Sequence, residues 1–220
     1  MANHTYSPLG NLTRLQSPDT GTTTYRYDAA GNRVRQTDAR GVQVSYAYDA
    51  LNRLTAVHYP NASLDVGFFY DEPAATTACT HAYASPLGRL TRIVDGTGST
   101  TYCYDDLGRI RLKTQVVDGR TFRVGYSYTK GDRLAAVTYP SGLTLRFTYD
   151  ASGRATALAY RPGGGTADIV LVSDASYAPF GPATSVRNGL QKRLVRGWDL
   201  NYAPTAIDSE TPGGLGLRYT

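Results

Sequence analysis

Cysteine, histidine, methionine and tryptophan are all scarce: the 220 residues include two Cys, three His, one Met and one Trp. So few sulfur and imidazole ligands argue against a framework of metal sites. No apolar run approaches the roughly 18 residues that a membrane-spanning helix needs, and residues 1–5 lack the basic and apolar regions of a signal peptide. We therefore expect no membrane span, no export signal in this chain and no metal cofactor.

The motifs of common enzymes are missing as well. No serine stands in a nucleophile-elbow context, and the glycine-rich stretches match neither a phosphate-binding loop nor a dinucleotide-binding turn. No stretch shows the 3.6-residue period of an amphipathic helix. The sequence thus predicts a protein that is not an enzyme, with no cofactor and little helix.

Tyrosine is abundant, with 18 Tyr against 5 Phe, and 23 Gly and 11 Pro are spread along the chain. Tyrosine packs its ring while leaving its hydroxyl on a wet surface, which suits a thin wall with little deep interior. Hydrophobic residues make up 41% of the chain, and segments 42–46 and 143–147 alternate with period two, as β-strands do. The net charge of +5 is modest and does not by itself predict nucleic-acid binding.

One motif recurs along the whole chain: Tyr-Asp, then Gly-Arg or Asn-Arg, then an aliphatic residue. Successive anchors are separated by 21, 21, 22, 34, 24, 21, 28, 21 and 21 residues, so the longer intervals are insertions into one rhythm. The sequence predicts a single repeat domain, residues 1–220, of about nine units with a tenth cut off. The anchors are Tyr6, Tyr27, Tyr48, Tyr70, Tyr104, Tyr128, Tyr149, Tyr177, Trp198 and, for the tenth, Tyr219.

Each unit has the length of one hairpin, with two strands of about six residues and two turns. At the first turn the Asp carboxylate can accept a backbone N–H, and Gly supplies a positive φ. Because one hairpin cannot bury its apolar face, neighbouring units must cover one another. We therefore predict an all-β fold with roughly eighteen strands, a continuous antiparallel meander of hairpin repeats that forms a curved or spiralling sheet.

These units resemble the RHS or YD repeat family, in which Tyr-Asp-x-x-Gly-Arg-Leu recurs about every twenty residues. The resemblance covers essentially the whole chain and implies a segment of an RHS/YD β-shell, as in bacterial Rhs proteins, toxin-complex C components and teneurins. The matching structural positions are Tyr27, Asp28, Gly31, Arg33, Tyr48, Asp49, Arg53, Tyr104, Asp105, Gly108, Arg109, Tyr149, Asp150, Gly153 and Arg154.

The resemblance also implies a function and a location. Such a segment would be a non-enzymatic part of a secreted or cell-surface shell that encloses or scaffolds a polypeptide such as a toxin. Its partners would be the rest of the shell, or another copy joined by strand-edge pairing, with no nucleic acid. Bacterial Rhs shells usually end near Asp-Pro-x-Gly-Leu, where the chain cleaves itself, and this sequence has no Asp-Pro.

An alternative from a different class is a carbohydrate-binding or cell-surface adhesion module that uses the sheet face. The arginines after the turns would line up between stacked units and offer a basic row to an acidic glycan. Arg109, Arg133 and Arg154 are the candidate ligand face. We favour the simpler interpretation that each Arg pairs with a turn Asp of its own or the adjacent unit.

Three further questions concern single residues. The recurring Asp28, Asp49, Asp105 and Asp150 are better explained as turn residues than as catalytic carboxylates. Cys79 and Cys103 can pair only if their Cα atoms lie within about 7 Å, which the sequence does not settle. A zinc site of Cys79, Cys103 and His81 is the alternative, although no fourth ligand is near in the sequence.

Overall fold

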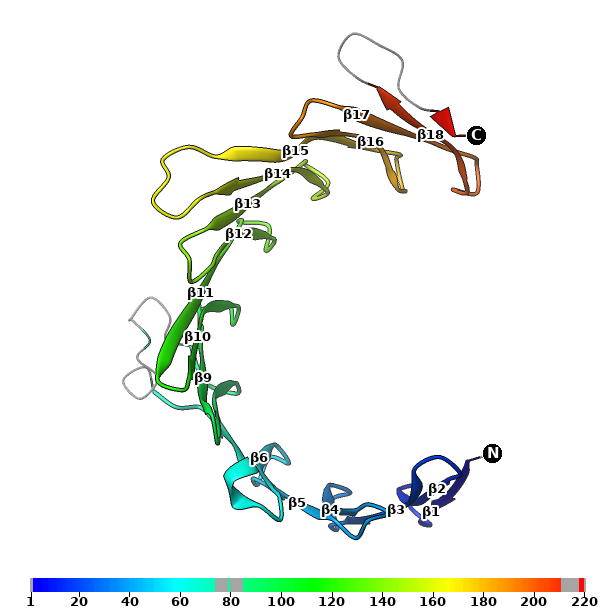
Figure 1. Cartoon of the computed structure of the whole chain (residues 1–220), viewed down its shortest axis with the longest axis vertical. Helices are drawn as coiled ribbons and strands as arrows, with labels where there is room; N and C mark the ends of the chain where they lie inside the picture. The colour runs from blue at the N-terminus through cyan, green and yellow to red at the C-terminus, as the bar shows by residue number, and fades with distance from the viewer. Residues whose placement is uncertain (1, 74–78, 80–84, 211–217, 220) are drawn as a thin grey trace. The chain divides into compact units, whose positions relative to one another are not determined.

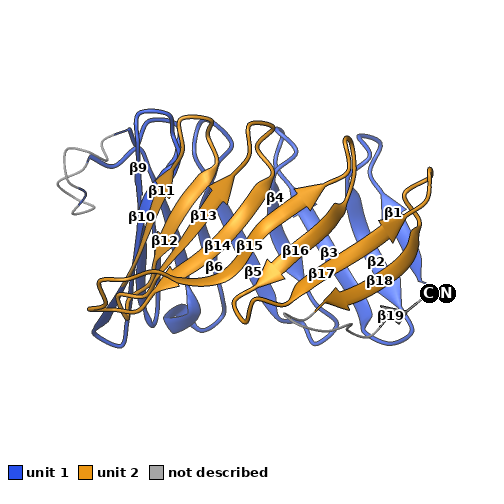
Figure 2. Ribbon diagram, turned by 90° about the horizontal axis from the view of Figure 1, so that it is seen from above, with its two compact units in different colours: residues 1–122 blue, residues 123–220 orange. Residues whose placement is uncertain are grey.

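The computed structural model describes residues 2–73, 79, 85–210 and 218–219. These residues form two compact units, 1–122 and 123–220 (Figure 2). In the described part of the chain, 19 strands account for nearly all regular structure, with one three-residue 3₁₀ helix. The predicted all-β fold is confirmed.

The first unit is an antiparallel meander in which each strand pairs with the next one along the chain (Figure 1). Its elements are β1 (Asn3–Tyr6), β2 (Leu12–Ser17), β3 (Gly21–Tyr27), β4 (Arg33–Thr37), β5 (Gln43–Tyr48), β6 (Leu54–His58), the 3₁₀ helix η1 (Ala62–Leu64), β7 (Val66–Tyr70), β8 (Leu90–Asp95), β9 (Gly98–Tyr104) and β10 (Ile110–Val117).

The second unit continues the same pattern of consecutive antiparallel pairs. Strand β11 (Arg120–Tyr128) crosses the boundary between the units, and its pairing with β12 begins at Gly125. The other strands are β12 (Leu134–Thr138), β13 (Thr144–Tyr149), β14 (Ala155–Arg161), β15 (Ile169–Tyr177), β16 (Ala183–Asn188), β17 (Arg193–Trp198), β18 (Pro204–Glu210) and β19 (Arg218–Tyr219).

Very few side chains are deeply buried, as expected when a single sheet has no second layer against it. Among the described residues, the buried apolar set is Val57, Cys103, Ala136 and Val137, and the buried polar set is Thr91 and Ser185. Most strand residues are only partly covered by their neighbours on the same face. The stability of each unit must therefore come mainly from contacts between adjacent hairpins rather than from a central core.

The two cysteines form a disulfide, which answers the question that the sequence left open. The Cα atoms of Cys79 and Cys103 are 5.7 Å apart, and Cys103 lies in β9 with 2% of its surface exposed. Both sulfurs are used in this bond, so neither is a free thiolate for the alternative zinc site. His81, the third residue of that alternative, lies outside the described residues.

The hairpins separate slightly at the edge where the tyrosine-aspartate turns lie. The β2–β3 ladder stops at the pair Arg14 and Thr24, which leaves the carbonyl of Leu12 without a strand partner on that side. The Tyr27 hydroxyl donates a hydrogen bond to this carbonyl at 2.9 Å. The anchor tyrosine therefore closes the opening between its own hairpin and the preceding one.

The same bond recurs at each later anchor whose donor and acceptor both lie in the described part of one compact unit. Each donor is an anchor residue, each acceptor is the carbonyl at the start of the preceding strand pair, and the distances run from 2.5 to 3.1 Å. The remaining pairs are Tyr48 to Arg33, Tyr70 to Leu54, Tyr104 to Leu90, Tyr149 to Leu134, Tyr177 to Ala155, and Nε1 of Trp198 to Ala183. The composition suggested that the tyrosine hydroxyls face solvent, but these anchor hydroxyls bind backbone carbonyls instead. They are structural donors.

Loss of one anchor hydroxyl should destabilise the protein more than loss of a neighbouring one. Tyr27→Phe leaves the Leu12 carbonyl unpaired, and we expect a cost of about 1 kcal/mol in the free energy of unfolding. Tyr25→Phe, on the same strand, is the matched control, because no hydrogen bond of the Tyr25 hydroxyl occurs in the described part of the chain. Urea unfolding of both variants tests this, and equal midpoints would contradict the role of the anchor.

Candidate functional site

The repeated polar residues gather at the edge formed by the tyrosine-aspartate turns, which we call the YD edge. The Asp28 Oδ1 atom accepts the backbone N–H groups of Ala30 at 2.9 Å and Asn32 at 2.8 Å. Asp49 and Asp105 accept the corresponding N–H groups two and four residues onward, and Asp150 accepts that of Arg154. Each carboxylate thus closes its own turn.

Units that depart from the motif close the turn by related chemistry. The Ser7 hydroxyl accepts the N–H of Asn11 at 3.1 Å, and the Thr129 hydroxyl accepts that of Arg133 at 3.2 Å. The left-handed position is held by Gly31 at φ 86°, and by Asn52 and Asp132 where glycine is absent, at φ 59° and 66°. Asn and Asp are the residues that tolerate this conformation best after glycine.

The turn carboxyls are held in the ionised form. The pKa of Asp49 lies below its ordinary value, first because the Arg53 backbone N–H donates to it and then because the Arg53 side chain does. The pKa of Asp150 is lowered in the same way by Arg154, again with the backbone N–H as the larger cause. A carboxyl that is stabilised as an anion is a poor general acid, so this environment favours the turn role over an acid–base role.

Three of the repeat arginines form ion pairs within their own turn. Arg53 Nε lies 2.7 Å from Asp49 Oδ2, Arg109 Nη2 lies 2.7 Å from Asp105 Oδ2, and Arg154 Nε lies 2.8 Å from Asp150 Oδ2. Arg33 instead lies over the Tyr46 ring at 4.6 Å, and Arg89 donates to the backbone carbonyl of Ser85 at 2.9 Å. Pairing with a turn Asp therefore accounts for some, but not all, of the repeat arginines.

Two of these arginines, Arg53 and Arg154, also contact the next repeat. Arg53 Nη2 lies 2.8 Å from Asp71 Oδ2, and its guanidinium carbon lies 4.3 Å from the centre of the Tyr70 ring. Arg154 lies 4.9 Å from the Tyr177 ring centre and donates to the Ala178 carbonyl at 3.1 Å. One guanidinium thus connects two successive turns.

The turn glycines leave room for these arginines. A Cβ atom added to Gly153 would collide with the Arg133 guanidinium, and one added to Gly108 would collide with that of Arg89. Gly31 has a similar φ but nothing within 4 Å of the added atom. Glycine at this position therefore serves the turn in every case, and in these two units it also receives the arginine of the preceding unit.

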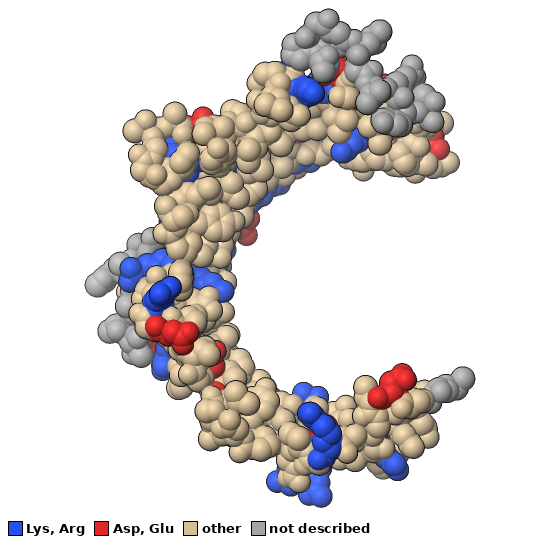
Figure 3. Space-filling view, in the orientation of Figure 1, with Lys and Arg blue, Asp and Glu red and all other residues tan. Residues whose placement is uncertain are grey.

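The candidate ligand face is largely engaged in these internal contacts. Arg109 and Arg154 pair with turn carboxylates, and Arg133 packs on Gly153. In Figure 3, charged side chains of both signs occur in each unit among a larger uncharged surface. Arginines that pair with carboxylates in this way give little net field for an acidic ligand.

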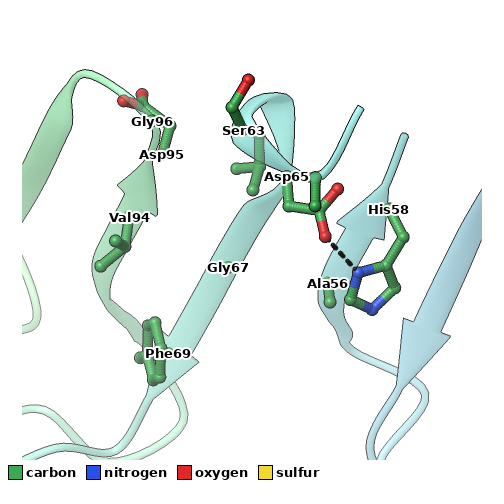
Figure 4. Close-up of a pocket in the computed structure, with 11 residues that line it drawn as sticks. Ala56, His58, Ser63, Asp65, Gly67, Phe69, Val94, Asp95 and Gly96 are labelled. Atoms are coloured by element: carbon green, nitrogen blue, oxygen red, sulfur yellow. Dashed lines mark hydrogen bonds and ion pairs between the residues drawn. The ribbon is translucent and has the colours of Figure 1, made fainter. Parts of the chain in front are cut away.

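A cavity of about 360 Å³ lies over β6, β7 and β8 beside η1 (Figure 4). His58 Nδ1 and Asp65 Oδ2 are 2.8 Å apart at its rim, and this bond is the main reason that the pKa of Asp65 is lowered. The Ser63 hydroxyl donates to Asn61 Oδ1 at 2.8 Å, away from His58 in the figure. Within the described part of the chain, no nucleophilic side chain is therefore hydrogen-bonded to His58.

No motif in the sequence predicts this pair, because His58 and Asp65 meet only across the turn that contains η1. Within the described residues, no group of three or more His, Cys, Asp or Glu side chains is arranged to hold a metal ion. In the same residues no helix has the length and apolar character to cross a membrane.

Comparison with known proteins points to one repeat family. A family model described as RHS Repeat matches residues 6–43, 29–64 and 128–166. Double-stranded DNA deaminase toxin A of Burkholderia cenocepacia (strain H111) is 29% identical over 163 residues, which cover 70% of this chain and 11% of that protein.

Solved structures with the same fold include a Tc holotoxin pore and TcdB2-TccC3. The crystal structure of TcdB2-TccC3 matches with a TM-score of 0.81 at 17% identity, over 96% of this chain and 11% of that chain. The Tc holotoxin pore of Photorhabdus luminescens matches with a TM-score of 0.79 at 17% identity, over the same shares. The chain therefore spans about a tenth of the length of the proteins that it resembles.

If the turn glycines have the two roles inferred above, alanine should be tolerated unequally at them. Gly31→Ala incurs only the cost of the left-handed backbone, about 1 kcal/mol. Gly153→Ala incurs that cost and also displaces Arg133, for a further loss on the order of 1 kcal/mol. Chemical unfolding of the two variants measures the difference, with Gly31→Ala as the control, and equal destabilisation would show that the arginine contact contributes nothing.

Proposed function

We propose that this chain, which belongs to the RHS repeat family, is a non-enzymatic segment of a β-shell wall that encloses or scaffolds a polypeptide such as a toxin. The supporting observation is the series of contacts between successive repeats along the YD edge. The anchor hydroxyls and several guanidinium groups bind the neighbouring unit, so the distinctive residues of the repeat serve the continuity of the sheet.

The similarity to toxins supports the wall interpretation rather than catalysis in this segment. The deaminase toxin and the Tc complexes are each matched over 11% of their length, and the matched part here is built of repeats. The turn carboxylates are used in hydrogen bonds that close the turns, as described above. We place any catalytic activity of a larger protein outside these repeats.

We also propose a secreted or cell-surface location. The Cys79–Cys103 disulfide supports it, because such bonds form and persist in oxidising environments. For the carbohydrate-binding alternative the structure offers no specific support, since the Arg109 and Arg154 side chains pair with turn carboxylates. That alternative stays a prediction.

Enclosure can be tested in the full-length polypeptide that contains this segment, by limited proteolysis with identification of the fragments. We expect one part of the polypeptide to resist cleavage until the wall is opened. Arg53→Ala removes the contact between successive turns and should expose that part severalfold faster. Arg40→Ala is the control, because among the described residues Arg40 pairs only with Asp38 of its own turn, and its side chain is 81% exposed. If no part of the polypeptide is selectively protected, the proposed function is wrong.

Joining to another wall segment should occur through strand edges. All four residues of β1 are exposed, and the strand registers of the described chain give it only β2 as a partner. An exposed edge with free N–H and C=O groups is a template for a further strand. We therefore propose that β1 is an edge that pairs with more shell or with a second copy.

A charge on that edge should weaken the pairing. Thr5→Lys on β1 should lower the self-association of the 220-residue chain, because lysine on an edge strand opposes addition of another strand. Thr24→Lys places the same charge on an exposed position of β3, which already has two partners, and should have no effect. Light scattering over a range of concentrations measures both. A monomer at every concentration in the unmodified chain would refute edge pairing.

A further inference from the structure

The first junction between repeats has an open slot where several later junctions have an arginine. A cavity of about 410 Å³ lies there, and its lining includes Leu9 and Asn11 of the first turn and Tyr27 and Asp28 of the second. All of these residues lie in the first compact unit, residues 1–122. The cavity is therefore part of one well-described pair of hairpins.

Later junctions show what normally occupies this position. Five residues after the anchor Tyr48, Arg53 lies over the Tyr70 ring at 4.3 Å and pairs with Asp71 at 2.8 Å. Five residues after Tyr149, Arg154 lies over the Tyr177 ring at 4.9 Å. In both cases a guanidinium contacts the first residues of the next Tyr-Asp turn or its equivalent.

At two other junctions an arginine also contacts the next turn. Arg89 lies 5.7 Å from the centre of the Tyr104 ring and packs on Gly108. Arg133 packs on Gly153 of the next turn. Arginine is thus the side chain that this chain itself uses at the position.

The first junction has the receiving groups but not the arginine. Asn11 stands five residues after Tyr6, and its side chain makes no hydrogen bond among the residues that the structure describes. Tyr27 and Asp28 hold the places of Tyr70 and Asp71. The pKa of Asp28 is lowered, mainly by the hydrogen bond from the Asn32 side chain, so its carboxylate is ionised at neutral pH.

At two other junctions that lack the arginine, another side chain of the protein takes its position. At the second junction, Asn32 Nδ2 reaches Asn52 Oδ1 of the next turn at 2.8 Å. At the junction after Tyr177, Pro182 replaces the arginine, and the ring of Tyr202 packs on Gly181 instead. The first junction has neither substitute, which is why a cavity remains there.

We propose that the slot formed by Tyr27, Asp28 and Asn11 binds the guanidinium group of an arginine side chain from a partner polypeptide. The Tyr27 ring offers a π face to the cation, and Asp28 Oδ2, which accepts the Asn32 Nδ2 group at 3.0 Å, retains a lone pair for a charge-assisted hydrogen bond. Arginine fits better than lysine because its planar group can stack and donate at the same time. Arg26 also lines the cavity and is a positive charge that competes with the ligand.

The probe is N-acetyl-arginine methylamide, titrated into the 220-residue chain and followed by NMR shifts of residues at the slot. We expect millimolar binding, with the lysine and citrulline analogues at least about tenfold weaker, since one lacks the planar group and the other the charge. Asp28→Asn keeps the Oδ1 acceptor that closes the turn and should weaken binding by about tenfold. Asp38→Asn, at a turn on the opposite edge, is the matched control and should leave binding unchanged.

A second variant fills the slot with an arginine of the chain itself. Asn11→Arg should place an arginine over Tyr27 and beside Asp28, abolish binding of the probe and raise the thermal unfolding midpoint. Thr20→Arg adds the same side chain at an exposed turn on the opposite edge and should change neither quantity. Unchanged probe binding in Asn11→Arg, or equal binding of the citrulline analogue, would overturn the proposal. The result does not depend on whether the wall encloses a polypeptide.

Discussion

A single hairpin in this protein cannot satisfy its own backbone at the YD edge, and the rest of the structure follows from that constraint. The ladder between successive hairpins stops before the strands end, so a carbonyl at the start of each strand pair loses its strand partner. An unpaired, partly buried carbonyl is costly. The anchor tyrosine of the next hairpin supplies the missing donor, which makes each unit depend on its neighbour.

The arginines add a second connection along the same edge. Burial raises the pKa of the anchor hydroxyls of Tyr48 and Tyr104, which agrees with their covered position. A guanidinium such as that of Arg53, which lies over the Tyr70 ring, binds one turn by its Nε atom and the next by its Nη2 atom. Exposed ion pairs contribute little individually, but a repeated bridge between neighbouring units acts where the sheet has no core to hold it.

The use of the repeat's polar side chains in contacts within the sheet also bears on function. Groups that look chemically useful in the sequence, namely rows of Tyr, Asp and Arg, are largely engaged with one another or with backbone. A repeat protein whose polar residues maintain continuity is suited to forming an extended surface. Specific binding is then expected at places where the pattern is broken, and the slot at Asn11 is such a place.

The sequence by itself determined the repeat, the strands and the turns, because these depend on contacts within about six residues. Asp28 closes a turn through Ala30 and Asn32, and the pattern Tyr-Asp-x-x-Gly is enough to predict a turn there. The period then fixed the antiparallel meander. Counting units gave roughly eighteen strands, close to the 19 that the described residues contain.

Only the tertiary structure decided which groups meet between units. The Tyr27 hydroxyl and the Leu12 carbonyl are 15 residues apart, Arg53 and Asp71 are 18 apart, and Cys79 and Cys103 are 24 apart. These contacts depend on strand register, on register shifts beside the anchors, such as that between Arg26 and Tyr27, and on the separation of the hairpins at one edge. The sequence pattern contains none of these quantities directly, since they arise only when neighbouring hairpins pack against each other.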